Sequence, residues 1–235
     1  MASRTSKKNI NSPDELQTIS RRLIEFILSH RRQAYLYTGI FAAVVIIVAG
    51  WHLYTIHYEA EANEMYAKAY SSYAIQGGDD DSEDVLKKAA ALYEELVKEY
   101  VSSDAAVLAY YNLGNIHYTL GDTDKSIEAY KMFLRSSDET SMLRSLAFYS
   151  LGYAYEVKGE YEQALKSFEN SEKSTTGIHF KTINYANIGR IYEKMDNIPK
   201  ALEYYGKVNG EDVDPFMKGL MKTKIASLNQ EGSNE

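Results

Sequence analysis

The chain contains no cysteine, and only three of its 235 residues are proline. The missing cysteines exclude disulfides, thiolate metal sites, a cysteine nucleophile and a lipidated cysteine anchor. The scarcity of proline suits a helical protein, because proline breaks helix interiors. Positive charge is also in the minority, since 26 Lys and Arg face 33 Asp and Glu for a net charge of −7. An acidic chain gains little from phosphate backbones, so nucleic acid is not an expected partner.

One segment near the N-terminus lacks charge over the 26 residues between Arg32 and Glu59. Its core, Tyr37–Trp51, is almost continuously apolar, and with its flanks it reaches the roughly 20 residues that a helix needs to cross a bilayer. Aromatic residues flank the core at both ends, as at membrane interfaces: Tyr35, Tyr37, Trp51, Tyr54 and Tyr58. We therefore predict a transmembrane signal anchor over residues 33–57.

A buried core helix and a cleaved signal peptide are the alternatives to this span. Ala60-Glu61-Ala62 has the small-x-small form of a cleavage site, but it lies well beyond the apolar core. The region before the core is also far longer than the basic region of a signal peptide. An uncleaved anchor fits better.

Charge asymmetry predicts the orientation of the anchor. Residues 1–32 contain seven Lys and Arg against three Asp and Glu, whereas residues 59–84 contain eight acids and one base. Because Lys and Arg resist translocation, we expect the N-terminus in the cytoplasm and the C-terminal part across the membrane. Residues 1–32 also predict an amphipathic helix that begins at the capping box Ser12-Pro13-Asp14-Glu15. Its apolar positions are Leu16, Ile19, Leu23, Phe26 and Ile27.

The exported part repeats itself three times. The matching blocks are Tyr110–Gly114, Phe148–Gly152 and Tyr185–Gly189, with glycines 38 and then 37 residues apart. Each block continues with an aromatic residue or histidine, a turn, a small residue and a second aromatic residue four positions later. These last pairs are Ser126/Tyr130, Ala164/Phe168 and Ala201/Tyr205. This is the tetratricopeptide repeat (TPR) pattern, with Tyr or Phe in place of Trp.

The repeat spacing has a physical reading. We expect the three glycines to let a second helix approach the first, opposite the small residues, while the aromatic residues fill the gap to the next repeat. A generic amphipathic bundle is the alternative, but amphipathicity alone does not place glycine at one phase three times. Residues 107–210 are therefore predicted to form three TPR repeats.

A degenerate hairpin and a capping helix are predicted on either side of these repeats. In the membrane-proximal hairpin, residues 58–106, Tyr70 replaces the close-packing glycine, so this hairpin is expected to splay or to merge with the emerging membrane helix. Gly77-Gly78 would make its turn, followed by an acidic run at residues 79–84. Residues 211–235 predict a capping helix that begins at Asp214-Pro215, followed by a loose tail. The apolar positions of that helix are Phe216, Leu220, Met221 and Ile225.

The fold class is therefore all-α: one N-terminal transmembrane helix followed by a TPR α-solenoid. No catalytic, cofactor-binding or metal-binding motif is present, and the five histidines lack metal-ligand spacing. His117 occupies a TPR packing position, where a structural role is expected. We predict a protein that is not an enzyme and needs no cofactor.

With no catalytic or metal motif present, the expected function is recognition of a partner by the protein surface. In a TPR stack, the first helix of each repeat lines the inner face. Phase counting predicts a partner groove from Leu108, Tyr111, Asn115, Tyr118, Leu146, Tyr149, Tyr153, Glu156, Arg190 and Glu193, with Lys194 beside them. Its tyrosines would offer rigid amphipathic contact area. The alternative is that some of them pack between repeats. A carboxylate clamp is disfavoured, because Tyr111 and Tyr149 stand where a clamp needs basic residues.

The whole layout resembles the YfgM-like ancillary subunits of the SecYEG translocon, over residues 13–229. The shared features are the basic N-terminus, one span that ends near Gly50-Trp51, an acidic membrane-proximal helix, TPRs and a capping helix. The resemblance implies a bacterial inner-membrane protein with a periplasmic TPR domain. It further implies translocon subunits, periplasmic chaperones or exported chains as partners, and no catalytic residues. Leu92–Val97 and Ser103–Ala106 are also similar to TPR lipoproteins of outer-membrane assembly, but the anchoring cysteine is missing here.

The sequence thus predicts a membrane-tethered interaction scaffold near the secretion machinery. Two alternatives stay open: a regulatory anchor that sequesters a cytoplasmic factor, and a structural subunit of an envelope assembly complex. Self-association is also open, through a small-residue face of the span (Gly39, Ala42, Ala43).

Overall fold

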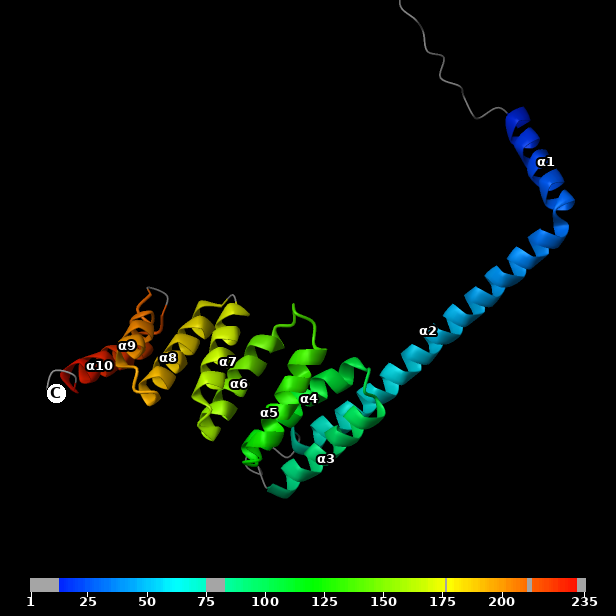
Figure 1. Cartoon of the computed structure of the whole chain (residues 1–235). Helices are drawn as coiled ribbons and strands as arrows, with labels where there is room; N and C mark the ends of the chain where they lie inside the picture. Colours follow the sequence, from blue (N-terminus) through cyan, green and yellow to red (C-terminus); the bar gives the residue numbers. More distant parts are fainter. Residues whose placement is uncertain (1–12, 75–82, 176, 211–212, 232–235) are drawn as a thin grey trace, which may run out of the picture. The chain divides into compact units, whose positions relative to one another are not determined.

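The computed structural model describes residues 13–74, 83–175, 177–210 and 213–231, and the regular elements in these residues are all helices. In chain order they are α1 (Pro13–Ser29), α2 (Arg31–Ala74), α3 (Glu83–Glu99), α4 (Asp104–Thr119), α5 (Thr123–Ser136), α6 (Leu143–Lys158), α7 (Tyr161–Lys173), α8 (Ile178–Lys194), α9 (Ile198–Gly206) and α10 (Pro215–Glu231) (Figure 1). They belong to two units, residues 1–57 and residues 58–235. Each unit is described by itself below.

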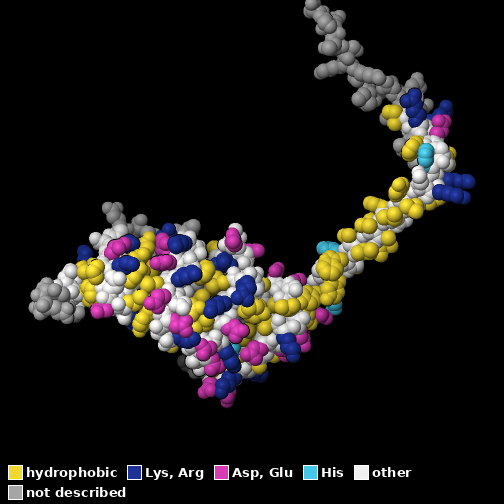
Figure 2. Space-filling view, viewed as in Figure 1, with side chains coloured by type: hydrophobic (Ala, Val, Ile, Leu, Met, Phe, Trp, Pro, Cys, Tyr) yellow, Lys and Arg dark blue, Asp and Glu magenta, His cyan; other side chains and the backbone are white. Residues whose placement is uncertain are grey.

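The first unit holds α1 and the apolar part of α2. The predicted amphipathic helix is present as α1, which begins at Pro13, while Ser12 of the capping box lies outside the described residues. Ile19 and Phe26 of α1 are more than half exposed. Within the described residues, α2 is the one helix that is long and apolar enough to cross a membrane by length and composition. Figure 2 shows hydrophobic side chains covering its apolar part, with Lys and Arg side chains at the α1 end.

The helix α2 does not end with the apolar segment but continues to Ala74. Of the two expectations for the first hairpin, merging with the membrane helix is the one observed. The physical reason is that residues 51–74 contain neither glycine nor proline, so nothing breaks the helix. The expected turn at Gly77-Gly78 and most of the acidic run lie outside the described residues.

The second unit begins with the C-terminal part of α2, which packs on α3 and α4. Ala62 and Ala69 are fully buried in one core cluster with Tyr93 of α3. Hydrogen bonds add to this packing: Asn112 Nδ2 donates to Tyr66 Oη at 2.8 Å. The Glu59 carboxylate also accepts from the backbone N–H of Asp104 at 3.2 Å, at the N-terminus of α4.

Consecutive helices from α3 to α10 lie side by side in chain order (Figure 1). The pairs α4/α5, α6/α7 and α8/α9 are the three predicted repeats, and the last helix of each pair packs on the first helix of the next. Two further core clusters follow the first, one centred on α5–α8 and one on α9 and α10. The all-α solenoid predicted from the sequence is therefore confirmed.

An aromatic ring lies directly over the glycine of each repeat. A Cβ added at Gly114, Gly152 or Gly189 would come within 2.5–2.7 Å of ring carbons of the second-helix aromatic residue. These ring residues are Tyr130, Phe168 and Tyr205, and all are buried. The sequence reading expected the small residues to meet the glycines and the rings to fill the gap to the next repeat. In the first repeat the small residue does meet the glycine, because Ser126 Oγ donates to Gly114 O at 2.9 Å. The ring, however, belongs to the same repeat and occupies the space that the missing Cβ leaves.

The turn inside each repeat uses a positive backbone φ. Gly121 and Gly159 have φ of 79° and 75°, and Asp196 has φ of 58° at the equivalent position of the third repeat. Glycine adopts this conformation without steric cost, and Asp is among the few other residues that tolerate it. The predicted turns are thus present in all three repeats.

The helix α10 begins as predicted, and two of its four predicted apolar positions pack against the core. Asp214 Oδ1 accepts from the N–H groups of Phe216 and Met217 at 3.0 and 3.1 Å, which caps the helix. Met221 is buried against the last core cluster, whereas Phe216 and Leu220 are 75% and 48% exposed. Of the four predicted apolar positions, Met221 and Ile225 thus pack against the core and Phe216 and Leu220 do not, because successive helix residues point about 100° apart and the core side also includes Met217 and Leu228.

We predict that Gly152→Ala lowers the stability of the full chain in detergent micelles, measured as the thermal unfolding midpoint by circular dichroism. The added methyl group would clash with the Phe168 ring, which typically costs about 1–3 kcal/mol, less up to about 1 kcal/mol of helix propensity. The matched control is Gly219→Ala in α10, where nothing lies within 4 Å of the added Cβ. The control should unfold at the same or a higher temperature. Equal midpoints for the two variants would contradict the close packing.

Candidate partner groove

Seven side chains from α4, α5 and α6 line a hollow of about 380 Å³: Asn115, Tyr118, Thr119, Tyr130, Tyr149, Ser150 and Tyr153. Four of these, Asn115, Tyr118, Tyr149 and Tyr153, are among the ten residues that the sequence places in a partner groove. The helices that carry them are adjacent because α5 packs against both α4 and α6. The hollow contains no charged side chain, and four of its residues are tyrosines: Tyr118, Tyr130, Tyr149 and Tyr153.

Hydrogen bonds hold three of the four phenol groups of this hollow. Tyr130 Oη donates to Asn115 Oδ1 at 2.7 Å, and Tyr153 Oη donates to Asn187 Oδ1 at 3.0 Å. Tyr149 Oη lies 3.2 Å from Tyr153 Oη. Burial, and after it the bond with Tyr153, raises the pKa of Tyr149 to about 12. Tyr149 therefore stays neutral at physiological pH, and the hydrogen bonds of Tyr130, Tyr149 and Tyr153 set the orientations of these three rings before any partner binds.

A charged cluster adjoins the hollow at Tyr153. The guanidinium of Arg190 lies 5.3 Å from the centroid of the Tyr153 ring and donates to Asn187 Oδ1 at 2.9 Å. Arg190 also donates to Glu156, and Lys194 Nζ lies 2.9 Å from the same carboxylate oxygen. Glu156 is only 8% exposed, so two cations compensate one buried carboxylate. Glu156 and Arg190 thus hold each other in place more than they face a partner.

The other four predicted groove residues lie outside the hollow. The Tyr111 ring packs on Phe133 and Tyr130, with centroids 5.5 and 6.1 Å apart, so it takes the packing role that the sequence left open. Glu193 accepts from Tyr205 Oη at 2.8 Å and pairs with Lys224. Leu108 and Leu146 are each 38% exposed on the first turns of α4 and α6.

Three residues of the hollow were missed by the sequence reading. Tyr130 was assigned to packing alone, but its hydroxyl reaches Asn115 across the helix pair while its ring covers Gly114. Thr119 and Ser150 each follow a predicted groove residue directly, and this adjacency was the available signal. First-helix phase counting could not find Tyr130, because Tyr130 belongs to the second helix.

His117 is buried, as its packing position predicts. Its Nε2 lies 3.5 Å from Glu94 and its Nδ1 lies 3.7 Å from Asp122, and it lines a second hollow of about 410 Å³ between α3, α4 and α5. Burial lowers the pKa of His117, helped by the charge of Lys125 and opposed by Glu94. In the described residues, no group of three or more His, Cys, Asp or Glu side chains could hold a metal ion.

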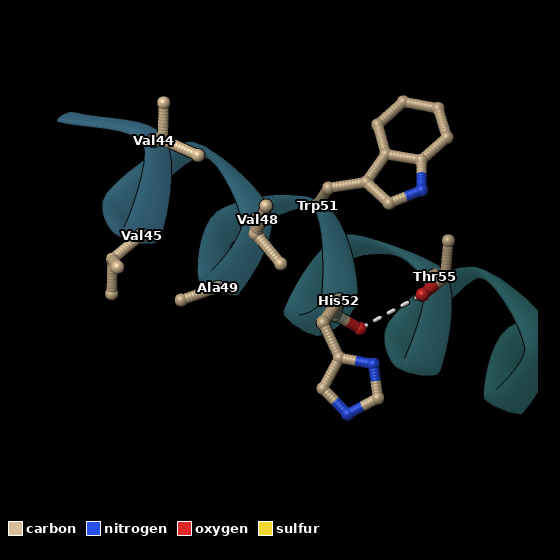
Figure 3. A pocket seen from close by; sticks show the side chains of 7 residues that line it. All are labelled: Val44, Val45, Val48, Ala49, Trp51, His52 and Thr55. Carbon is tan, nitrogen blue, oxygen red and sulfur yellow. Dashed lines mark hydrogen bonds between the residues drawn. The ribbon is translucent and has the colours of Figure 1, made fainter. Parts of the chain in front are cut away.

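A third hollow, of about 630 Å³, lies along one side of α2 and is lined by Val44, Val45, Val48, Ala49, Trp51, His52 and Thr55 (Figure 3). All seven residues come from one helix, and Thr55 Oγ1 donates to the backbone oxygen of His52 at 2.9 Å. Trp51 and His52 project to different sides of the helix (Figure 3). This surface therefore brings no set of polar groups together.

Stacked helix pairs, each with a glycine under an aromatic ring, define an α-solenoid of the tetratricopeptide class. The family model of the tetratricopeptide repeat-like domain matches residues 31–230, and the chain belongs to this family. The match includes α2, in line with its role as the first helix of the stack.

Some solved structures are similar to this chain. The MamA RS-1 ArsTM double mutant is similar over 78% of this chain and 84% of that chain, with a TM-score of 0.51 and 11% identity. A crystal structure of MamA matches 53% of this chain and 67% of that chain, at 25% identity and a TM-score of 0.46. BtubC from P. vanneervenii matches 87% and 96% of the two chains, at 17% identity and a TM-score of 0.45. No curated protein sequence matches the chain.

We predict that Arg190→Met destabilises the solenoid by about 1–3 kcal/mol, because it leaves the buried Glu156 carboxylate with Lys194 alone. The double variant Glu156→Leu/Arg190→Met should lose less than the single variant, since the buried charge is gone. Thermal unfolding of the full chain in detergent measures both. Lys87→Met, which breaks an exposed pair with Glu83, is the control and should leave the midpoint unchanged. A double variant as unstable as Arg190→Met would contradict the compensation.

We predict that His117 makes the solenoid less stable in mild acid. Because its pKa is lowered in the folded state, the unfolded chain takes up the proton first, and stability falls as pH drops below the ordinary histidine pKa of about 6.5. His117→Phe should flatten the pH dependence of the urea midpoint between about pH 7.5 and 5.5. The carboxylates titrate in both proteins, so the difference between the two curves isolates His117. Parallel curves would contradict this role.

Proposed function

We propose that the protein is a non-enzymatic interaction scaffold that holds protein partners at a membrane surface. The observation that carries the proposal is the hollow lined by four tyrosines, three of them hydrogen-bonded, on α4, α5 and α6, here called the tyrosine pocket and defined by the seven lining residues above. Aromatic rings held in place by hydrogen bonds lose little entropy on binding and present large contact areas. Such a surface suits apolar or aromatic side chains of a polypeptide.

The apolar part of α2 supports a tether in this proposal. A single span would keep the solenoid at the membrane, so that membrane partners meet the tyrosine pocket at a high effective concentration without strong intrinsic affinity. The excess of Lys and Arg in residues 1–32 favours a cytoplasmic N-terminus, and the acidic part from residue 59 favours export. In a bacterial cell, a span with this orientation would put the solenoid in the periplasm.

The finer proposal is that the scaffold works beside the Sec translocon and passes exported chains to periplasmic chaperones. It is supported by the resemblance in layout to the YfgM-like translocon subunits. Newly exported chains expose aromatic and apolar side chains, which match the chemistry of the tyrosine pocket.

The test is photocrosslinking in native membranes, with a photoreactive phenylalanine analogue in place of Tyr118, which is 38% exposed at the pocket. We expect adducts to translocon subunits, chaperones or exported chains. Thr119→Arg, at an exposed position of the pocket, should reduce the adduct yield about tenfold by filling the hollow. The same analogue at the exposed Lys166 of α7 is the control and should give none of these adducts.

Other outcomes would contradict parts of the proposal. Adducts to a single envelope complex, insensitive to Thr119→Arg, would favour a structural subunit instead. Adducts to other exported or membrane proteins, with none to a translocon component, would support the scaffold function but contradict the association with the translocon.

A further inference from the structure

The last helix of the solenoid has two different faces. Met221 and Leu228 of α10 are buried against α9, and Met217 and Ile225 pack beside them. The opposite stripe, at positions 216, 219, 220 and 223, is exposed and holds Phe216, Gly219, Leu220 and Thr223. Phe216 is 75% and Leu220 48% exposed. A terminal helix normally turns a polar face to water, so an uncharged apolar stripe here calls for a reason.

The position of α10 in the stack supplies a reason for its exposed apolar stripe. It packs on α9 as α6 packs on α5 and α8 on α7, so it stands in the place of the first helix of a further repeat. In each complete repeat, the first helix carries a glycine that lies under an aromatic ring of the second helix. Gly219 has nothing within 4 Å of its Cβ position. Within the described residues, no second helix packs on α10.

The charge of α10 narrows the choice of what could cover it. The helix α10 contains three lysines and one acidic residue, Glu231, at its last position. Lys224 pairs with Glu193 at 2.6 Å, whereas Lys222 is exposed beside the apolar stripe. Two copies of α10 would bring like charges together, which disfavours self-pairing. A helix with carboxylates at its edges would be complementary.

We propose that the stripe Phe216, Gly219, Leu220 and Thr223 of α10 is a docking site for an acidic amphipathic helix of a partner protein. The partner helix packs on α10 as the second helix of each repeat packs on the first, with apolar side chains on Phe216 and Leu220 and a large side chain over Gly219. Its carboxylates face Lys222. This site lies at the end of the solenoid and is independent of the tyrosine pocket.

The test uses the full chain in native membranes, with a photoreactive phenylalanine analogue in place of Phe216, followed by mass spectrometry of the crosslinked peptide. We expect a discrete adduct whose partner segment is amphipathic with helical spacing and negatively charged. Leu220→Glu and Lys222→Glu should each reduce its yield about tenfold, the first by burying a charge in the interface and the second by reversing the complementary charge. Thr119→Arg in the tyrosine pocket should leave it unchanged.

Lys222→Glu serves as the variant that keeps the fold, because its side chain is exposed, and an unaltered unfolding midpoint verifies this for both variants. An adduct that survives both charge substitutions would overturn the proposal. So would a basic partner segment, an adduct only between copies of this chain, or no adduct above that of the analogue at Lys166. Loss of the Phe216 adduct together with retention of the Tyr118 adducts would separate this site from the proposed scaffold function.

Discussion

The contact on which the stack depends is the aromatic ring seated on a glycine in each helix pair. It sets the distance between the two helices of a repeat, because the ring fits only where the Cβ is missing. The distance within each pair in turn determines where the next pair begins. In the first repeat the same ring residue, Tyr130, also extends its hydroxyl to Asn115 at 2.7 Å. The packing contact and the proposed binding surface therefore share one side chain, whose ring packs on Gly114 and whose hydroxyl lines the tyrosine pocket.

The sequence predicted the repeats because glycine recurs at one phase, and this signal is local. It also selected Asn115, Tyr118, Tyr149 and Tyr153, which the structure brings into one hollow, because residues of one helix face can be counted from the glycine. It could not separate Tyr111 from these, since burial of Tyr111 depends on the ring of Phe133, one helix further on. Nor could it decide which of the apolar positions of α10 meet the core. Periodicity identifies an apolar stripe, but only the neighbouring helices determine which stripe is covered.

One ion cluster of the solenoid also has two roles, because it joins two repeats and contacts the tyrosine pocket. The buried carboxylate of Glu156 is compensated by Arg190 and Lys194 from the next first helix, so an ion cluster joins two repeats that otherwise meet through apolar contacts. Arg190 also covers the Tyr153 ring, which ties the cluster to the tyrosine pocket. Such a joint gives little net stability compared with apolar packing, but it penalises other registers of the helices, because each of them would leave a buried charge alone.

The continuous helix α2 affects how readily a protease could release the solenoid from the apolar segment. Proteases cut most readily at exposed loop tips, yet the boundary between the two units, at residues 57 and 58, falls within a helix. Ala62 and Ala69, a few turns further along, are buried in the first core cluster. Cleavage near the boundary therefore requires the helix to unwind locally, against the packing of that core. A solenoid built in this way stays joined to its apolar segment without any linker for a protease to attack.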